Sequence, residues 1–305
     1  MSSQISVKNM LAELLAISHP LAPFDMPLLD AHGATLADDI YLDDQVVLRK
    51  GVRIRSPQIG LAASLGLSRL PTQPHPRVVV VSAGDDLVEP GQEIGEAQEF
   101  EINSWMLATA AKEAGAVAYR VHTIPENPAQ LRAVIEDQMV RADLIIISGE
   151  SHDGSFELIR SVLDEVGDVD TATPNLQGSS VHCYGIIGED AIPVVVLPGN
   201  PMCAFISFEI FIRPMIRTML GVRNVFRASV KAEIAADVES PIGEASLIRA
   251  TLFYSEAGEL GVRALSFQDD LVSLSEASAF ITVSADSPGY LKGEIAEIIV
   301  MDRTV

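Results

Sequence analysis

Short runs of consecutive apolar residues dominate the middle of the chain. They include Val78 to Val81, Leu144 to Ile147 and the segment IPVVVL at 192–197. Such runs are typical of parallel strands that are covered on both faces. Apolar residues at helical spacing predict helices between and after them, at about Asn103 to Ala114, after Pro128, from Phe156 to Val166 and from Met202 to Leu220. Strands that alternate with helices in this way predict right-handed crossovers and a doubly wound α/β sheet.

The first part of the chain carries weaker signals. Apolar spacing predicts a short amphipathic helix over Val7 to Ile17, which packs on the rest of the chain or dimerises. Ser56 before Pro57 predicts a helix that Ser56 caps and that ends near Gly66. Three prolines between Leu70 and Pro76 favour an extended connection, so a domain boundary is expected there.

After Gly221 the pattern changes to an alternation of apolar and polar residues. Stretches of this kind, separated by Gly, Asp and Pro turns, predict strands at Ser229 to Ala235, Leu247 to Tyr254, Leu260 to Leu265, Phe280 to Val283 and Ile295 to Met301. A small β-barrel or sandwich is therefore expected at the end of the chain. The predicted domains are a small α+β region at 1–75, an α/β domain at 76–222 and a β domain at 223–305.

Composition supports the α/β class and excludes several functions. Hydrophobic residues make up 48% of the chain and aromatic residues only 5%, which fits a core of aliphatic side chains. A net charge of −21 repels nucleic acid and anionic membrane surfaces, so neither is an expected partner. No export signal and no membrane span is recognisable. Cys183 and Cys203 form neither a disulfide framework nor a zinc spacing, which predicts a reduced, cytoplasmic environment.

Three predicted strands end in glycine-containing loops, at Ser82 to Leu87, Ser148 to Gly154 and Leu197 to Pro201. Ligands of open α/β sheets bind beyond the carboxyl ends of the strands, where loops diverge and helix N-termini point inward. Each loop alone is more often an ordinary turn than a ligand site. Three of them at one edge of a sheet predict a shared ligand cleft.

The polar residues of these loops suit an anionic ligand, with or without a cation. Asp85 and Asp86 form either a solvated acidic turn or a site for a cation such as Mg²⁺. Asn200 is expected to cap a helix that begins at Pro201, which leaves backbone amides free for an anion. Trp105 follows helical spacing and is expected in the core.

The order of several motifs resembles the molybdopterin molybdenumtransferase family, which includes MoeA and the gephyrin E domain. The matching segments are RVVVVSAGDDLVEPGQ, EINSWMLATAAKEAGA, IPENPAQLR, ADLIIISGE, VVVLPGNPMCAFISFEIFIRPMI, SLSEASAFITV and YLKGEIAEIIV. The most specific of them is LPGNP followed by an apolar helix. The resemblance spans nearly the whole chain and implies a MogA-like α/β domain, a C-terminal β-barrel and an elongated homodimer.

The resemblance also implies an activity. Family members insert molybdenum from molybdate into adenylylated molybdopterin with the help of Mg²⁺, and release AMP and the finished cofactor. By this resemblance Asp86 and Glu157 are expected to be catalytic and to bind the metal. The residues expected to bind the pterin ligand are Gly84, Asp85, Ser148, Gly149, Ser151, Gly199, Asn200 and Pro201.

The sequence departs from the family pattern in two large features. The S-A-M-D-G-Y-A-like motif and an inserted β domain are missing, since only about twenty residues separate Asp38 from Gly60. In family dimers this region forms part of the lining of the partner's active site, and that part of the lining is expected to be absent. The K-P-G-K-P loop becomes Thr173 to Gln177, and no lysine occurs between Lys112 and Lys231.

Single positions change as well. The usual glutamate is the shorter Asp86, an acid is lost at Asn127, a carboxylate replaces a glycine at Glu150, and Gln268 to Asp270 adds negative charge. All these changes predict a weaker anion site.

Lysines at positions 173 and 176 would neutralise phosphate or molybdate in the transition state, and Thr173 and Leu176 cannot do so. Loss of such groups commonly slows a reaction by orders of magnitude. The prediction is a molybdenumtransferase-like protein with impaired catalysis. The alternative is a non-catalytic, gephyrin-like adaptor that binds a protein partner such as a cytoskeletal or receptor tail.

Overall fold

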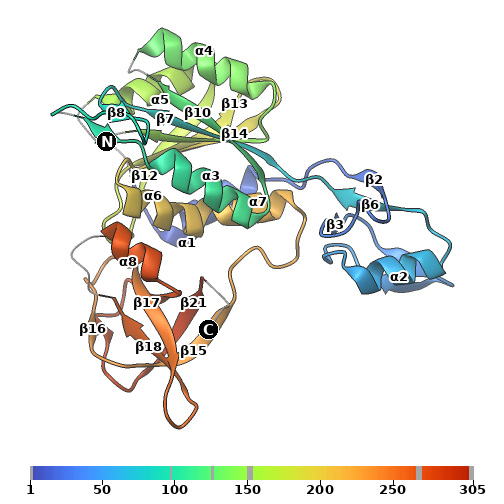
Figure 1. Cartoon of the computed structure of the whole chain (residues 1–305). Coiled ribbons are helices and arrows are strands. Elements are labelled where there is room, and N and C mark those ends of the chain that lie inside the picture. The colour runs from blue at the N-terminus through green and yellow to red at the C-terminus, as the bar shows by residue number, and fades with distance from the viewer. Residues whose placement is uncertain (1–2, 97, 125–126, 150–153, 266–269, 302–305) are drawn as a thin grey trace.

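The computed structural model describes residues 3–96, 98–124, 127–149, 154–265 and 270–301. A central α/β domain lies above a C-terminal β-barrel, and a small N-terminal unit extends to one side of both (Figure 1). No helix in the described part of the chain is long and apolar enough to cross a membrane.

A seven-stranded sheet forms the centre of the molecule. Its order is β1 (Ser3–Ile5), β12 (Gly167–Pro174), β13 (His182–Ile187), β14 (Ile192–Leu197), β11 (Leu144–Gly149), β7 (Arg77–Ala83) and β10 (Val117–Ile124). All neighbours are parallel except β13, which runs antiparallel to both β12 and β14. The predicted doubly wound α/β domain is confirmed. β13 reverses because the turn that joins it to β14 is too short for a crossover helix.

Helices cover both faces of this sheet. One face packs against α1 (Val7–Ala16), α3 (Asn103–Ala114), α6 (Pro201–Ser207) and α7 (Arg213–Met219), and the other against α4 (Pro128–Met139) and α5 (Ser155–Val166). Successive residues of β7 alternate between the two cores, Val78 and Val80 on one side and Val79 and Val81 on the other. The uninterrupted apolar runs therefore reflect strands that are buried on both faces.

The helical segment predicted from Met202 to Leu220 is continuous but not uniform. A π-helical turn, η1 (Phe208–Ile212), lies between α6 and α7. Phe208 and Phe211 are fully buried in this turn.

The small N-terminal unit holds the three-stranded sheet β2 (Phe24–Pro27), β6 (Arg69–Gln73) and β3 (Thr35–Leu36). It also holds the hairpin β4 (Ile40–Leu42) with β5 (Gln45–Leu48) and the helix α2 (Ser56–Ser64). The prediction that Ser56 caps α2 is wrong: Ser56 is its first residue, and the Arg55 N–H donates to Gln58 Oε1 at 3.1 Å. β1 and α1 lie outside this unit, because Met10 and Leu14 are fully buried against the central sheet and its helices.

The C-terminal part is a closed barrel, which resolves the choice between barrel and sandwich. It is built from β15 (Ser229–Ile234), β18 (Leu260–Ala264), β17 (Ser246–Tyr254), β19 (Ala279–Val283) and β21 (Ile295–Val300). A short pair, β16 (Val238–Glu239) with β20 (Gly289–Tyr290), and the helix α8 (Asp270–Glu276) complete it. The division of the chain at 75 and 222 remains a prediction.

Candidate functional site

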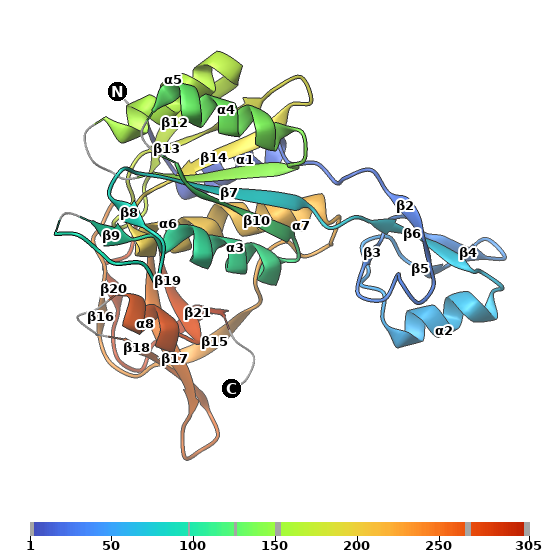
Figure 2. The ribbon, with the colours of Figure 1, turned by 45° about the horizontal axis from the view of Figure 1, so that its top comes forward.

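The strands β7, β11 and β14 are neighbours in the sheet and end at the same edge. Ser148 on β11 pairs with Ser82 on β7 and with Leu197 on β14. The three glycine-containing loops therefore leave the sheet side by side, at the end that also carries β8 and α6 (Figure 2). This edge is where an open α/β sheet binds its ligands.

Asn103, the first residue of α3, connects two of these loops. Its Nδ2 donates to Ser148 Oγ at 2.8 Å and to the Gly199 carbonyl at 2.6 Å. Its Oδ1 is buried and accepts no hydrogen bond from the part of the chain that the structure describes. Sequence reasoning missed this residue, although a polar Asn-Ser pair directly before an apolar helix was a usable signal.

Asn103 lines a cavity of about 60 Å³ at the strand ends. The other lining residues are Leu87, Glu99, Phe100, Glu101, Ile102, Ser148, Gly149, Gly199 and Pro201. Four of the predicted ligand-binding residues are thus brought together here, namely Ser148, Gly149, Gly199 and Pro201. A Cβ at position 149 would lie 2.4 Å from Ile159 Cδ1 of α5, so a larger residue there would have to displace the end of that side chain.

The first loop contributes only its last residue, Leu87, to the cavity lining. Gly84 is buried, Asp85 is exposed and Asp86 is half-buried. The Asp86 carbonyl accepts a hydrogen bond from the Glu99 N–H at 3.0 Å. This bond helps to pair β8 (Leu87–Val88) with β9 (Glu99–Phe100), which forms one side of the cavity.

The two residues expected to bind a metal lie on different elements, Asp86 before β8 and Glu157 on α5. Glu157 lies in the first turn of α5, its side chain is 70% exposed, and it forms an ion pair with Arg160 at 3.0 Å. Within the described ranges no three His, Cys, Asp or Glu residues are placed to hold a metal ion. These residues do not fit a bound Mg²⁺, so we derive no step through one. Glu150, Ser151 and Gln268 to Asp269 lie outside the described residues, and the Asp86 and Glu157 assignment stays a prediction.

The third loop forms the predicted helix start. Pro201 is the first residue of α6, and the Asn200 side chain accepts a hydrogen bond from the Cys203 N–H at 3.1 Å. The expectation that Asn200 caps this helix is confirmed. Pro201 has no N–H and the Cys203 N–H is donated to Asn200, so the Met202 N–H is the remaining amide among the first three residues of the helix.

Glu101, which lines the cavity, belongs to a partly buried network of hydrogen bonds and ion pairs. The Glu101 carboxylate accepts hydrogen bonds from the Ser104 N–H at 2.8 Å and hydroxyl at 2.6 Å, and from Arg120 at 3.1 Å. Arg120 also pairs with Glu89 at 2.8 Å. Two carboxylates thus neutralise the nearest guanidinium. Glu101 is paired with Arg120, whereas Glu99 is exposed and no basic side chain lines the cavity, so the lining offers an anion no positive charge.

Trp105 belongs to the same network and corrects a prediction. The ring is 49% exposed rather than in the core. The Arg120 guanidinium lies 3.8 Å from the ring centroid, and the indole N–H donates to Glu89 at 3.2 Å. The ring face thus contacts a cation and the indole N–H has an acceptor, so Trp105 is stabilised at the surface without being buried.

The loop at the family's lysine positions has become an apolar interdomain contact. Leu176 is only 4% exposed and packs in a cluster with Met202 and Ile206 of α6. The Gln177 N–H donates to the Ala245 carbonyl at 2.8 Å, and the Ala245 N–H donates to the Asn175 carbonyl at 2.9 Å. The loop therefore joins the α/β domain to the barrel segment, and Leu176 lies beside the first turns of α6.

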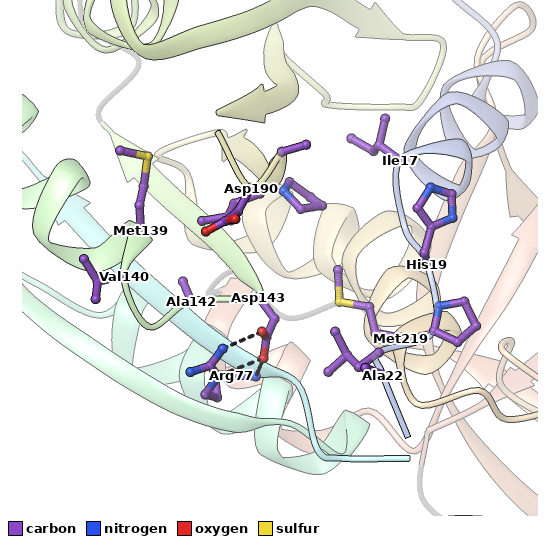
Figure 3. Close-up of a pocket in the computed structure, with 15 residues that line it drawn as sticks. Ile17, His19, Ala22, Arg77, Met139, Val140, Ala142, Asp143, Asp190 and Met219 are labelled. Atoms are coloured by element: carbon purple, nitrogen blue, oxygen red, sulfur yellow. Dashed lines mark hydrogen bonds and ion pairs between the residues drawn. The ribbon is translucent and has the colours of Figure 1, made fainter. Parts of the chain in front are cut away.

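A second hollow, of about 410 Å³, lies at the opposite ends of the strands (Figure 3). Arg77 begins β7 there and bonds Asp143, with distances of 2.8 and 3.1 Å from its guanidinium nitrogens to the carboxylate oxygens. The pair satisfies both charges within the chain. We assign no ligand to this hollow, because ligands of open α/β sheets bind at the carboxyl ends of the strands.

The chain is similar to proteins of molybdenum cofactor synthesis. A family model described as a probable molybdopterin binding domain matches residues 79–218. Molybdopterin molybdenumtransferase 1 of Mycobacterium tuberculosis is 32% identical over 267 residues, which cover 86% of this chain and 62% of the relative. Molybdopterin molybdenumtransferase 2 of the same species is 36% identical over 212 residues, 68% of this chain and 52% of the relative. The chain thus spans less than two thirds of the length of these curated relatives.

The fold is shared with a solved structure. The molybdopterin biosynthesis MoeA protein from Pyrococcus horikosii superposes with a TM-score of 0.82 at 16% identity. The superposition covers 98% of this chain and 100% of that chain. At this identity the likeness concerns the fold alone, and it includes the α/β domain and the barrel.

Proposed function

We propose that the chain, which is similar to molybdopterin molybdenumtransferases, is a member of that family and binds adenylylated molybdopterin in the cleft at the ends of β7, β11 and β14. The observation that carries this proposal is the Asn103 side chain. It holds Ser148 and Gly199 in place and keeps one buried oxygen without a donor in the described chain. Buried acceptors normally have a partner, and a pterin ring offers amino and ring N–H donors.

The cavity beside Asn103 limits how the ligand binds. At about 60 Å³ it accepts one edge of a ring but not a whole pterin nucleotide. The rest of the ligand would lie outside, along the first loop and the start of α6. Pro201 has no N–H and the Cys203 N–H is donated to Asn200, so the Met202 N–H is the amide of this helix start that the phosphate groups would meet.

We further propose that the chain inserts molybdate slowly. Two glutamates line the cavity, Arg120 is paired with two carboxylates, and Leu176 occupies a former lysine position in an apolar cluster. No positive charge from these residues would offset the charge of molybdate in the transition state. A homodimer and a cytoplasmic location enter the proposal from the family resemblance, whereas Mg²⁺ stays a prediction of that resemblance and no part of the proposal. The named relatives are transferases, which favours cofactor synthesis over the adaptor role.

Calorimetry with AMP and with adenylylated molybdopterin tests the binding step. We expect saturable binding by the natural chain and an affinity lower by about tenfold for Asn103→Ala, because a buried polar partner is lost. Ser148→Ala should weaken binding less, since it removes only the acceptor that orients Asn103. Asn9→Ala changes an exposed asparagine on α1 and serves as the matched control.

A molybdate-dependent insertion assay then tests the reaction. Slow turnover that depends on Asn103 would support the proposal. If neither AMP nor adenylylated molybdopterin binds at about 1 mM, the weakest range of specific affinity, the proposal is wrong. If Asn103→Ala and Ser148→Ala fold and bind these ligands as well as the natural chain does, the ligand binds elsewhere and the proposal is also wrong.

A further inference from the structure

Four arginines line one cavity of about 440 Å³ beyond the C-terminal half of the long helical run. They are Arg213 and Arg217 on α7, and Arg223 and Arg227 in the segment that leads to the barrel. The chain has 42 acidic and only 21 basic residues, so four arginines around one cavity run against its overall charge. No acidic side chain of the described residues lines this cavity.

One carboxylate neutralises one of these arginines. Glu209 binds Arg227 through two hydrogen bonds, of 2.6 Å from Nε and 2.8 Å from a terminal nitrogen. The same carboxylate lies 3.9 Å from Arg213 Nε, which is an ion pair without a hydrogen bond. Glu113 on α3 adds a weaker attraction for Arg213 and Arg227.

The other arginines bond carbonyl oxygens, which carry no net charge. Arg213 donates to the Val225 carbonyl at 3.3 Å, and Arg223 donates through Nε to the Lys50 carbonyl at 2.9 Å. Arg217 donates to the Ala114 carbonyl at 3.5 Å, while its buried Nε has no acceptor among the residues that the structure describes. These contacts tie α7 and the segment after it to α3 and to the N-terminal unit, but they leave positive charge uncompensated.

This concentration of charge is unfavourable without a counter-ion. Burial, and then the neighbouring charge of Arg227, lower the pKa of Arg213 to about 10. Burial and the charge of Arg53 also lower the pKa of Arg217. Like charges held in a partly buried site cost stability, and an anion between them would remove that cost. The hydrogen bonds to carbonyls do not explain why these residues are arginines, because a neutral side chain could donate them as well.

We propose that this cavity binds the dianionic phosphate group of a small molecule. Guanidinium groups match phosphate oxygens with paired hydrogen bonds. Three of the four arginines donate no hydrogen bond to a carboxylate of the described residues. A volume of about 440 Å³ exceeds a bare phosphate ion and falls in the range of small-molecule sites. Twelve residues of helix separate Pro201 from Arg213, about 18 Å, so this site is distinct from the cleft.

Binding of inorganic phosphate and of ribose 5-phosphate tests the proposal. Both are titrated by calorimetry near about pH 8, where the phosphate is a dianion, with chloride keeping the ionic strength constant. We expect saturable binding by the natural chain and a loss of about tenfold in affinity for Arg217→Gln and for Arg223→Gln. Arg132→Gln removes an exposed arginine from α4 and should leave the affinity unchanged.

The two ligands separate the possible sources of the phosphate group. Tighter binding of ribose 5-phosphate identifies a phosphomonoester, and equal binding identifies the phosphate group alone as the recognised part; both support the proposal. No saturable binding of either compound up to about 10 mM overturns it. Undiminished binding by Arg223→Gln, whose side chain is exposed and whose folding is therefore secure, overturns it as well. Asn103→Ala should bind phosphate normally, so failure of the cleft proposal is distinguishable.

Discussion

His182 is a fully buried imidazole between β13 and α6. Its Nε2 lies 2.9 Å from Ser207 Oγ, its Nδ1 lies 2.9 Å from the Ser180 carbonyl, and its ring meets Phe211 edge-on. Burial disfavours the charged form and lowers the pKa of His182 from 6.5 to about 4. The ring is therefore neutral in the folded protein at any pH above that value.

This burial predicts a loss of stability in mild acid. Between the unfolded and folded pKa values the unfolded chain binds a proton that the folded chain does not, so the free energy of unfolding falls as the pH drops. The His182 contribution to this loss is about 2 kcal/mol between pH 7 and 5. Urea unfolding at both pH values should show a smaller drop for His182→Gln. An equal drop in both proteins would contradict the assignment.

Leu176, at a position where the related family has lysine, is packed against apolar side chains. A lysine restored at this position would place an ammonium group against Met202 and Ile206. We expect Leu176→Lys to lower the free energy of unfolding by about 3 kcal/mol, because an unpaired charge is buried. Gln177→Lys adds the same charge at the next, exposed position and should cost less than about 0.5 kcal/mol. Urea unfolding compares the two, and equal stability would show that the pocket around Leu176 admits water.

At the level of elements, the π-helical turn has a cause in the sequence. Pro214 has no N–H to donate to the Ile210 carbonyl, and its ring would collide with that carbonyl in a regular α-helix. η1 ends at Ile212, directly before α7 and its proline. The widened turn removes the conflict, and the apolar spacing that predicted one uniform helix contains no information about it.

Two helix caps, those of α6 and α2, should contribute similarly to stability but differently to ligand binding. Asn200→Ala removes an acceptor for the Cys203 N–H and should cost about 1 kcal/mol of stability. Gln58→Ala removes the corresponding bond at the start of α2, in the N-terminal unit, and should cost no more than that. Urea unfolding measures both. In calorimetry with AMP only Asn200→Ala should weaken binding, and an equal effect of the two variants would contradict a ligand at α6.

At the scale of the whole molecule, the N-terminal unit projects from the α/β domain on two strands of chain (Figures 1 and 2). It exposes large apolar side chains, including Phe24, Leu29, Tyr41 and Leu42. Exposed apolar side chains can take part in a surface that binds a second chain when they form a contiguous patch. They agree with the homodimer that the family resemblance implies.

Light scattering tests this assembly. The natural chain of 32.7 kDa should appear with twice that mass. Leu42→Glu places a charge on the β4–β5 hairpin and should shift the mass toward the monomer. Leu291→Glu changes a leucine on the barrel that is still more exposed, and it should leave the mass unchanged. A single chain mass at all concentrations would refute the homodimer.

Much of this architecture was predictable because it rests on local patterns. The runs at Val78 to Val81 and Leu144 to Ile147 predicted buried strands, and Asn200 with Pro201 predicted a helix start. Trp105 was wrongly predicted in the core, because helical spacing does not reveal that Arg120 of β10 lies over its ring. Asn103 was missed because its two acceptors lie 45 and 96 residues away along the chain.

The sequence by itself determined the α/β class, the barrel-forming strands, the family resemblance and the absence of lysine at positions 173 and 176, since residue type and short spacing set these properties. Only the tertiary structure decided that Ser148, Gly149, Gly199 and Pro201 line one cavity with Asn103, and that Leu176 is buried at an interdomain contact. It also decided that four arginines share one cavity. The physical reason is that side chains distant in sequence meet only after the helices and strands have packed, and charge and burial at each site follow from that packing.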